Sequence, residues 1–189
     1  MTGVADDIRS VDVNEQRASG VSHPHWRLFV NSLIAAEISA VTRLFNRVVT
    51  LCRGPEDVSP LYGMVEAPIH QQVQSSEALH AALSGGGDYT AVLLNGTFNH
   101  EYDIEGLLRC LWQNMSRSSR VISVVYNPYL KWLYHLANHV GIRQGEEPST
   151  FVTSTDLRNI SALAGFEVVR VRPVVFVPWR LSGLGTLIN

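Results

Sequence analysis

A short polar cluster follows an apolar run in the middle of the chain. The run TAVLLNG (90–96) is continuously apolar until its end, as in strands buried on both faces of a parallel sheet. Asn95, Gly96, Asn99 and His100 close this run, and we expect them at the carboxyl edge of the sheet, where open α/β sheets bind ligands. His100 is the candidate general base or substrate contact, because an imidazole exchanges protons near neutral pH. Helix capping by Asn99 or His100 would explain the same residues.

The remaining histidines and cysteines do not indicate a metal or a nucleophile. His135 and His139 stand four residues apart on a predicted helix, a spacing found in zinc sites, but the sequence signals no catalytic glutamate between them and no third ligand. Cys52 and Cys110 are too few for a four-thiolate zinc site or a disulfide framework. We therefore predict no metal site. The sequence also lacks a Gly-x-Ser-x-Gly elbow and a P-loop.

The elements that must position these residues can be predicted from hydrophobic periodicity. Apolar residues three and four apart predict helices, and short β-branched or continuously apolar runs predict strands. The predicted order is helix 25–45, strand 47–52, helix 76–83, strand 90–96, a helix capped by Asp103, strand 121–126, helix 129–140, and a helix from Thr155 to Ala164 with Gly165 as its left-handed cap. This alternation indicates a mostly parallel sheet with helices on both faces.

Two regions are harder to assign. Residues 62–66 and 69–74 could be short strands on either side of Pro68. The run FEVVRVRPVVFVP (166–178) indicates one long strand or a hairpin, with Pro173 at an edge or a bend.

Composition bounds the class of protein. The chain has 189 residues and a net charge of −2, which gives no overall basic field to attract nucleic acid or an acidic membrane. The sequence holds no apolar run of the roughly 20 residues that a membrane span needs, and its acidic start does not resemble a secretory signal. We expect a mobile arm at 1–22, one α/β domain at 23–189, and a soluble cytoplasmic protein.

Four features between Asp88 and Pro178 carry a family resemblance. They are Asp88-Tyr89 ahead of TAVLLNG, the loop and helix FNHEYDIEGLLRCLWQNM, the strand SRVISVVYN, and the ending STDLRNISALAGFEVVRVRPVVFVP, in which AGF and EVV after a helix are the most specific. This half of the chain resembles the C-terminal half of class I S-adenosylmethionine-dependent methyltransferases. The resemblance implies a Rossmann-like sheet, shortened relative to the full methyltransferase fold.

The N-terminal half departs from that family pattern. In the family, the first strand leads into an acid and a glycine-rich loop, E/D-x-G-x-G-x-G, whose glycines let the backbone approach the cofactor. The matching stretch here is VVTLCRGPED (48–57), with Thr50 near the place of the acid and only Gly54 left of the glycines. Pro55 removes an amide donor, and Arg53 adds a cation where a sulfonium would sit.

The second strand of the family normally ends in an acid that binds the cofactor ribose. Glu66 could take that role, or it could be a solvated acid at a strand end. The resemblance thus implies Gly54, Glu66, Asn95 and Gly96 as the candidate cofactor contacts. Too few residues separate Gly54 from Glu66 for a loop, a full helix and a strand, so we expect a missing helix and a shallow pocket.

These observations predict a methyltransferase-like protein that has lost S-adenosylmethionine binding. It would stabilise or activate a homologous methyltransferase as a non-catalytic subunit, or self-associate, with 25–45 and 166–178 as candidate contact elements. One alternative is an active methyltransferase that binds S-adenosylmethionine and acts on a small molecule, with His100 as its base. A second is a scaffold repurposed to bind or cyclise a metabolite.

Overall fold

The computed structural model describes residues 25–52, 59–84, 89–101, 103–139 and 148–175. The predicted arm at 1–22 and the candidate Gly54 lie outside these residues. The helices are α1 (His25–Thr42), α2 (Ser76–Ser84), α3 (Ile104–Asn114), α4 (Lys131–His139) and α5 (Ser154–Leu163), with the short 3-10 turns η1 (Thr97–Asn99) and η2 (Pro128–Leu130). The strands are β1 (Arg47–Leu51), β2 (His70–Val73), β3 (Thr90–Asn95) and β4 (Arg120–Val124).

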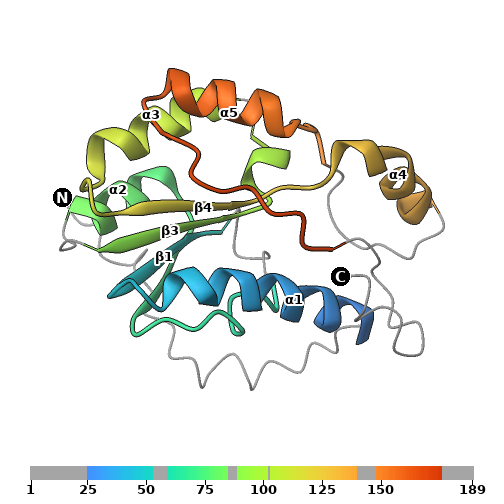
Figure 1. Cartoon of the computed structure of the whole chain (residues 1–189), viewed down its shortest axis with the longest axis horizontal. Helices are drawn as coiled ribbons and strands as arrows, with labels where there is room; N and C mark the ends of the chain where they lie inside the picture. Colours follow the sequence, from blue (N-terminus) through green and yellow to red (C-terminus); the bar gives the residue numbers. More distant parts are fainter. Residues whose placement is uncertain (1–24, 53–58, 85–88, 102, 140–147, 176–189) are drawn as a thin grey trace, which may run out of the picture.

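The four strands form one parallel sheet in the order β2-β1-β3-β4. Helix α1 covers one face of this sheet, and α2, α3 and α5 cover the other, as Figure 1 shows. The predicted α/β class with helices on both faces is therefore confirmed. No helix within the described ranges is both long and apolar enough to cross a membrane.

Each face of the sheet has its own apolar core. Val49, Val92 and Leu94 face α2, α3 and α5, whereas Val48 and Leu93 face α1. All five side chains are fully buried. This burial on both faces explains why β3 is read from the sequence as a continuous apolar run.

Helix ends follow local sequence signals. The side chain of Asp103 accepts a hydrogen bond from the amide of Gly106 at 2.8 Å and caps α3 as predicted. At α5 the N-cap is Thr153, two residues before the predicted start, and Thr153 forms a reciprocal capping box with Asp156. Gly165 follows α5 with a φ of 93°, the left-handed conformation predicted for it.

The predicted strand at 62–66 is wrong. This stretch forms turns, in which the amides of Met64 and Val65 both donate to the carbonyl of Leu61. Leu61 and Val65 pack into the core beneath α1. The turn conformation buries both apolar side chains against the helix, so they leave water without forming a strand. The weaker prediction at 69–74 is confirmed as β2.

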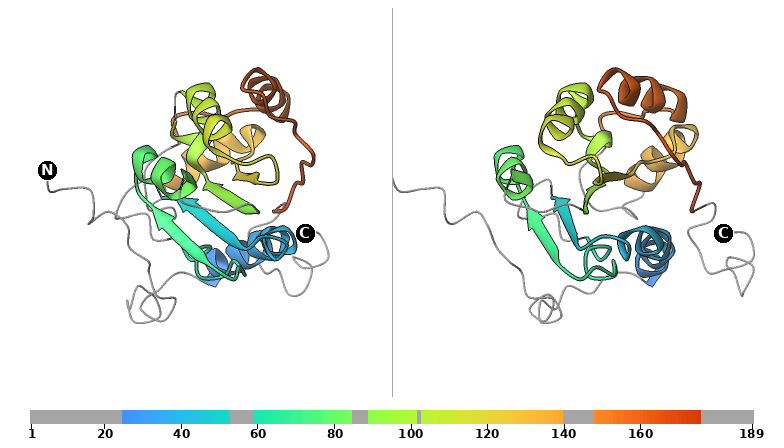
Figure 2. Two further views of the ribbon diagram at one scale, coloured as in Figure 1. Left: turned by 90° about the vertical axis from the view of Figure 1, so that its left-hand side faces the viewer. Right: turned by 60° about the vertical axis from the view of Figure 1, so that its left-hand side comes forward.

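The predicted strand or hairpin at 166–178 is not formed over residues 166–175, which are neither helix nor strand in the structure. We call residues 166–175 the edge segment. Figures 1 and 2 show that it leaves the α5 layer, passes beside β4 and descends toward α1. The edge segment therefore lies beside β4 without joining the sheet.

Candidate functional site

The sheet has a topological switch point between β1 and β3. The chain passes from β1 to β2 on one side and then to β3 on the other, so the loops after β1 and β3 diverge at the carboxyl edge. Ligands of open α/β sheets bind at such a point. Asn95 ends β3 here, and its Nδ2 donates to Oγ of Ser59 at 3.2 Å, joining the β3 end to the segment that follows the β1 loop.

Gly96 makes a tight turn directly after β3. Its φ is 68°, which a residue with a side chain rarely adopts, and its amide donates to the carbonyl of Val124 at 2.9 Å. A Cβ at this position would lie 3.4 Å from the hydroxyl oxygen of Tyr126. Gly96 therefore allows the chain to turn while the Tyr126 ring packs against it.

Asn99 is fully buried and joins three segments. Its Nδ2 donates to the carbonyl of Thr150 at 2.9 Å, and its Oδ1 accepts from the amide of Tyr126 at 2.8 Å. Its backbone carbonyl accepts from the amides of Ser149 and Thr150 at 2.9 and 3.0 Å. The Asn99 amide group thus connects the turn after β3, the end of β4 and the approach to α5.

The whole turn after β3 is closed by packing. Thr97, Phe98 and Asn99 of η1 are all buried, with Phe98 only 2% exposed. His100 caps the end of η1, where its amide donates to the carbonyl of Thr97 at 3.0 Å. The side chain of His100 is half-buried, and both of its ring nitrogens are screened from solvent. His100 therefore stands at the predicted edge of the sheet, within a packed turn.

Glu66 lies at the opposite edge. Its amide donates to Oγ of Ser39 at 3.0 Å, and its carbonyl accepts from Oγ1 of Thr42 at 2.7 Å, both at the end of α1. Glu66 precedes β2 and does not end a strand, because the residues of the predicted strand at 62–66 form turns. The structure therefore brings Asn95, Gly96 and His100 together and separates Glu66 from them.

A second polar group, which sequence reasoning missed, lies on the α1 face of the sheet. Nε2 of His70 and Oγ1 of Thr50 are 2.8 Å apart, and Thr50 is fully buried. Burial lowers the pKa of His70 below its usual value of 6.5, because imidazolium loses hydration there. Sγ of Cys52 lies 3.8 Å from Oε1 of Gln72 on the same face. Polar residues at alternate positions of β1 and β2 were the sequence signal that could have revealed this group.

The histidine pair on α4 does not gather further ligands. His135 and His139 are exposed, and among the residues that the structure describes no three histidine, cysteine or acidic side chains are grouped to hold a metal ion.

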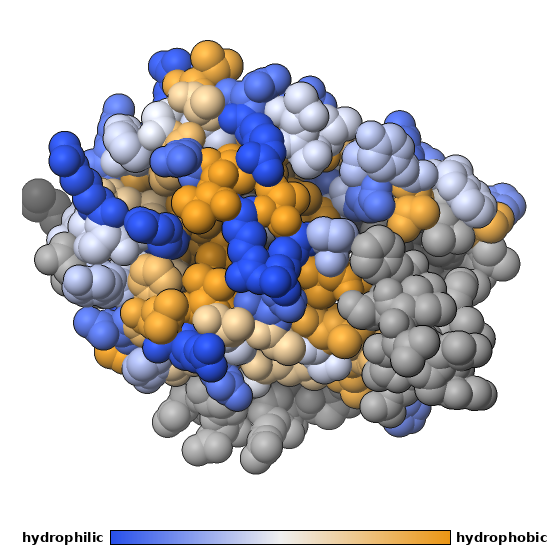
Figure 3. All heavy atoms as spheres, viewed as in Figure 1, coloured by the Kyte–Doolittle hydropathy of each residue, from blue (hydrophilic) through white to orange (hydrophobic). Residues whose placement is uncertain are grey.

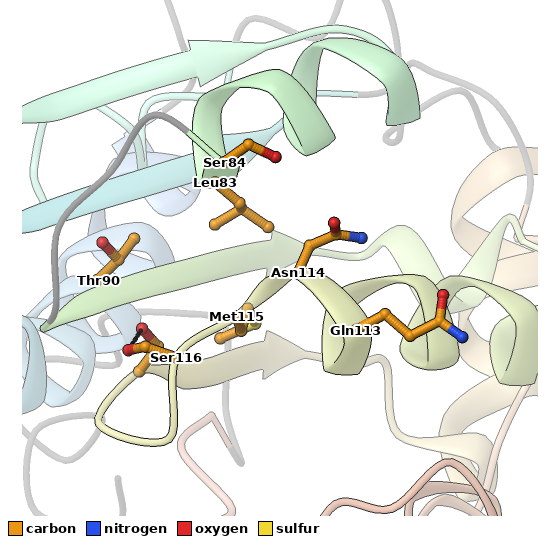
Figure 4. Close-up of a pocket in the computed structure, with 8 residues that line it drawn as sticks. Leu83, Ser84, Thr90, Gln113, Asn114, Met115 and Ser116 are labelled. Atoms are coloured by element: carbon orange, nitrogen blue, oxygen red, sulfur yellow. Dashed lines mark hydrogen bonds between the residues drawn. The ribbon is translucent and has the colours of Figure 1, made fainter.

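A cavity of about 240 Å³ opens at the amino edge of the sheet. Figure 4 shows Ser84, Thr90, Asn114 and Ser116 around it, from the ends of α2 and α3 and the start of β3. Its lining groups are neutral hydroxyls, amides and apolar side chains. This cavity lies at the opposite end of the strands from Asn95 and His100, so it does not belong to the predicted site.

The fold and the carboxyl edge of the sheet define an open parallel α/β protein. Its own side chains fill the turn at the topological switch point. Comparison with known proteins adds no relative, since neither a family model, nor a curated protein, nor a solved structure matches the chain.

Proposed function

We propose that the chain is a methyltransferase-like subunit that does not bind S-adenosylmethionine and instead stabilises or activates a homologous methyltransferase. The observation that carries the proposal is the packed turn after β3. Asn99 directs both of its side-chain polar atoms to other segments of the chain, at 2.9 and 2.8 Å. These atoms are committed to holding loops together, at the edge where a ligand would need polar contacts.

The residues after β2 support the same proposal. The methyltransferase resemblance places a ribose-binding acid at this strand end, but the chain continues with Gln74 and Ser75. Oγ of Ser75 accepts from the amide of Ala78 at 3.1 Å and so caps α2. Glu66, the acid considered for the ribose, stands at the other edge.

An exposed apolar face suits a partner subunit. Tyr129, Trp132 and Leu136 are 81%, 65% and 50% exposed, and their spacing aligns them on one face of η2 and α4. Exposed aromatic residues are enriched at the energetic centres of interfaces. We assign this α4 face to the contact with the methyltransferase partner.

Calorimetric titration of the chain with S-adenosylmethionine and S-adenosylhomocysteine tests the first half of the proposal. We expect no heat of binding up to millimolar cofactor. One-to-one binding in the micromolar range would overturn it and would favour the active methyltransferase with His100 as its base.

Co-expression with homologous methyltransferases of the same source tests the second half. The activity of the true partner should rise when the chain is present, and W132A should remove the increase. L163A is the matched control, because Leu163 is 67% exposed on α5, away from the α4 face. If no methyltransferase gains activity, or if both variants act alike, the subunit role is wrong.

A further inference from the structure

The cavity of about 240 Å³ at the amino edge of the sheet has an unusually polar wall. Eight residues line it, from the ends of α2 and α3, the start of β3 and the loop between α3 and β4, as Figure 4 shows. Six of them carry hydroxyl or amide side chains, namely Ser84, Thr90, Gln113, Asn114, Ser116 and Ser119. Since small-molecule pockets are lined mainly by apolar side chains, this wall indicates a ligand that forms several hydrogen bonds.

The hydroxyl groups of the wall are held in place by the fold. Thr90 and Ser119 are only 3% and 9% exposed. Oγ of Ser116 lies 2.9 Å from Oγ of Ser118 and 2.9 Å from Oγ of Ser119, so three hydroxyls form one chain in the loop before β4. Because each hydroxyl can both donate and accept, this chain can turn its hydrogens to suit either kind of ligand group.

Asn114 adds an acceptor to the wall. Its Nδ2 donates to the carbonyl of Cys110 at 2.7 Å, which fixes the orientation of the amide group. Oδ1 of the same group makes no hydrogen bond to the rest of the described chain. A hydroxyl of a ligand can therefore donate to Oδ1, while Leu83 and Met115 offer the apolar part of the wall.

The wall carries no charge. None of the described residues that line the cavity is ionisable. Arg47 pairs with Thr90 in the sheet, but its Nη2 donates to the carbonyl of Ala82 at 2.5 Å and is thus bound to the end of α2. A charged ligand would lose hydration in the cavity without meeting an opposite charge, so a neutral ligand is favoured.

A purely apolar ligand is disfavoured for a different reason. It would displace water from the hydroxyl and amide groups of the wall and form no hydrogen bond in return. Apolar side chains gather instead on another face of the molecule, where Figure 3 shows them between the α5 layer and α1, crossed by strongly hydrophilic side chains. The ligand of the cavity should therefore be neutral and rich in hydroxyl groups.

We propose that this cavity binds a small neutral polyol, of the size of a monosaccharide or less. The volume of about 240 Å³ lies below the range of about 300–1,000 Å³ that is usual for drug-sized ligands. The hydroxyl groups of the ligand pair with the serine hydroxyls and with Asn114, and its C–H groups contact Met115. The site is independent of the proposed partner role, because it lies at the opposite end of the strands from Asn95.

Titration of the isotope-labelled full chain with glycerol, myo-inositol and glucose, followed by amide chemical shifts in NMR spectra, tests the site. We expect saturable shifts at millimolar concentration of at least one of these polyols, centred on residues 83–84 and 113–119. Gluconate has a similar size to glucose but carries a negative charge. It should bind at least about tenfold more weakly than the best of the three polyols.

Two variants test where the polyol binds. Ser84 is exposed at the end of α2, so S84F should fold normally and close the cavity, with at least about a tenfold loss of affinity. A81F is the matched control, because Ala81 is exposed on the same helix and does not line the cavity. T90V replaces one buried hydroxyl of the wall by a methyl group and should weaken binding about fivefold.

Four results would each overturn the proposal. They are the absence of saturable shifts with all three polyols, binding of gluconate as tight as that of the best polyol, equal affinities of S84F and A81F, and an unchanged affinity of T90V.

Discussion

The side chain of Asn99 holds the candidate site together, because it bonds to the backbone of two other segments. Asn99→Ala removes a donor to the carbonyl of Thr150 and an acceptor for the amide of Tyr126, and leaves two partly buried backbone groups without these partners. Each such loss costs about 1–3 kcal/mol for a buried group, and because these two groups are only partly buried we expect the free energy of unfolding to fall by about 2–4 kcal/mol. Urea denaturation measures this change.

Asn95→Ala is the control for this prediction. Asn95 is half-buried and donates one hydrogen bond, to Ser59 at 3.2 Å, so its loss should cost less than about 1.5 kcal/mol. Equal destabilisation by the two variants would show that Asn99 has no special structural role.

His70 should make stability depend on pH. Because burial lowers its pKa below 6.5, the unfolded chain binds a proton more readily than the folded chain. The full stability is present above pH 6.5 and decreases as the pH falls from there toward the folded-state pKa. We expect His70→Gln to reduce this decrease between about pH 7.5 and about pH 5.5, measured as the urea midpoint.

His80→Gln serves as the comparison, since His80 is exposed on α2. A wild-type slope that His80→Gln alters as much as His70→Gln does would argue against the buried pair of His70 and Thr50 as its source.

At the scale of elements, the start of α5 depends on one hydroxyl. Oγ1 of Thr153 accepts from the amide of Asp156 at 3.2 Å, and Oδ2 of Asp156 accepts from the amide of Thr153 at 3.3 Å. Thr153→Ala removes this N-cap and should lower the free energy of unfolding by about 1 kcal/mol. Thermal unfolding followed by circular dichroism would record it as a lower Tm.

Ser154→Ala provides a neighbouring control. Ser154 is exposed at the first position of α5, and alanine has the higher helix propensity there, so Tm should stay the same or rise slightly. A loss of Tm in both variants would mean that the capping box is not the cause.

For the whole molecule, Glu37 links the edge segment to α1. Its two carboxylate oxygens accept hydrogen bonds from Nη1 of Arg172 at 3.0 and 3.1 Å, and both side chains are substantially exposed. Exposed ion pairs contribute little to global stability, about 0–1 kcal/mol. We therefore expect Glu37→Gln to leave the urea midpoint nearly unchanged while trypsin cleaves the chain faster after Arg170, because the edge segment loses its attachment to α1.

Glu105→Gln breaks a comparable exposed ion pair, between Glu105 and Arg109 on α3. It should leave the rate of cleavage after Arg170 as it is in the wild type. An unchanged cleavage rate in Glu37→Gln would contradict the anchoring role of Glu37.

The sequence by itself determined the kinds of elements and the class of fold. The apolar run at β3, the cap of α3 by Asp103 and the left-handed Gly165 are local signals, and each was read correctly because hydrogen bonds and burial within a few residues decide it. The alternation of strands and helices then indicated the parallel sheet, because parallel neighbours require crossover connections.

The tertiary structure decided what depends on contacts far apart in the chain. Residues 62–66 turn instead of pairing, since Leu61 and Val65 find burial beneath α1 and the backbone of Glu66 bonds to Ser39 and Thr42. This places Glu66 at the opposite edge of the sheet from Asn95, a separation that sequence distance does not reveal.

The same reason applies to the edge segment and to the site. Residues 166–175 have the apolar pattern of a strand, but a strand requires a neighbouring strand. Within the described ranges, residues 167–175 form no backbone hydrogen bond. The pairing of His70 with Thr50 and the bonds of Asn99 likewise join positions 20 and more residues apart. Periodicity determines which side of an element is apolar, whereas only the packed chain determines which polar groups meet.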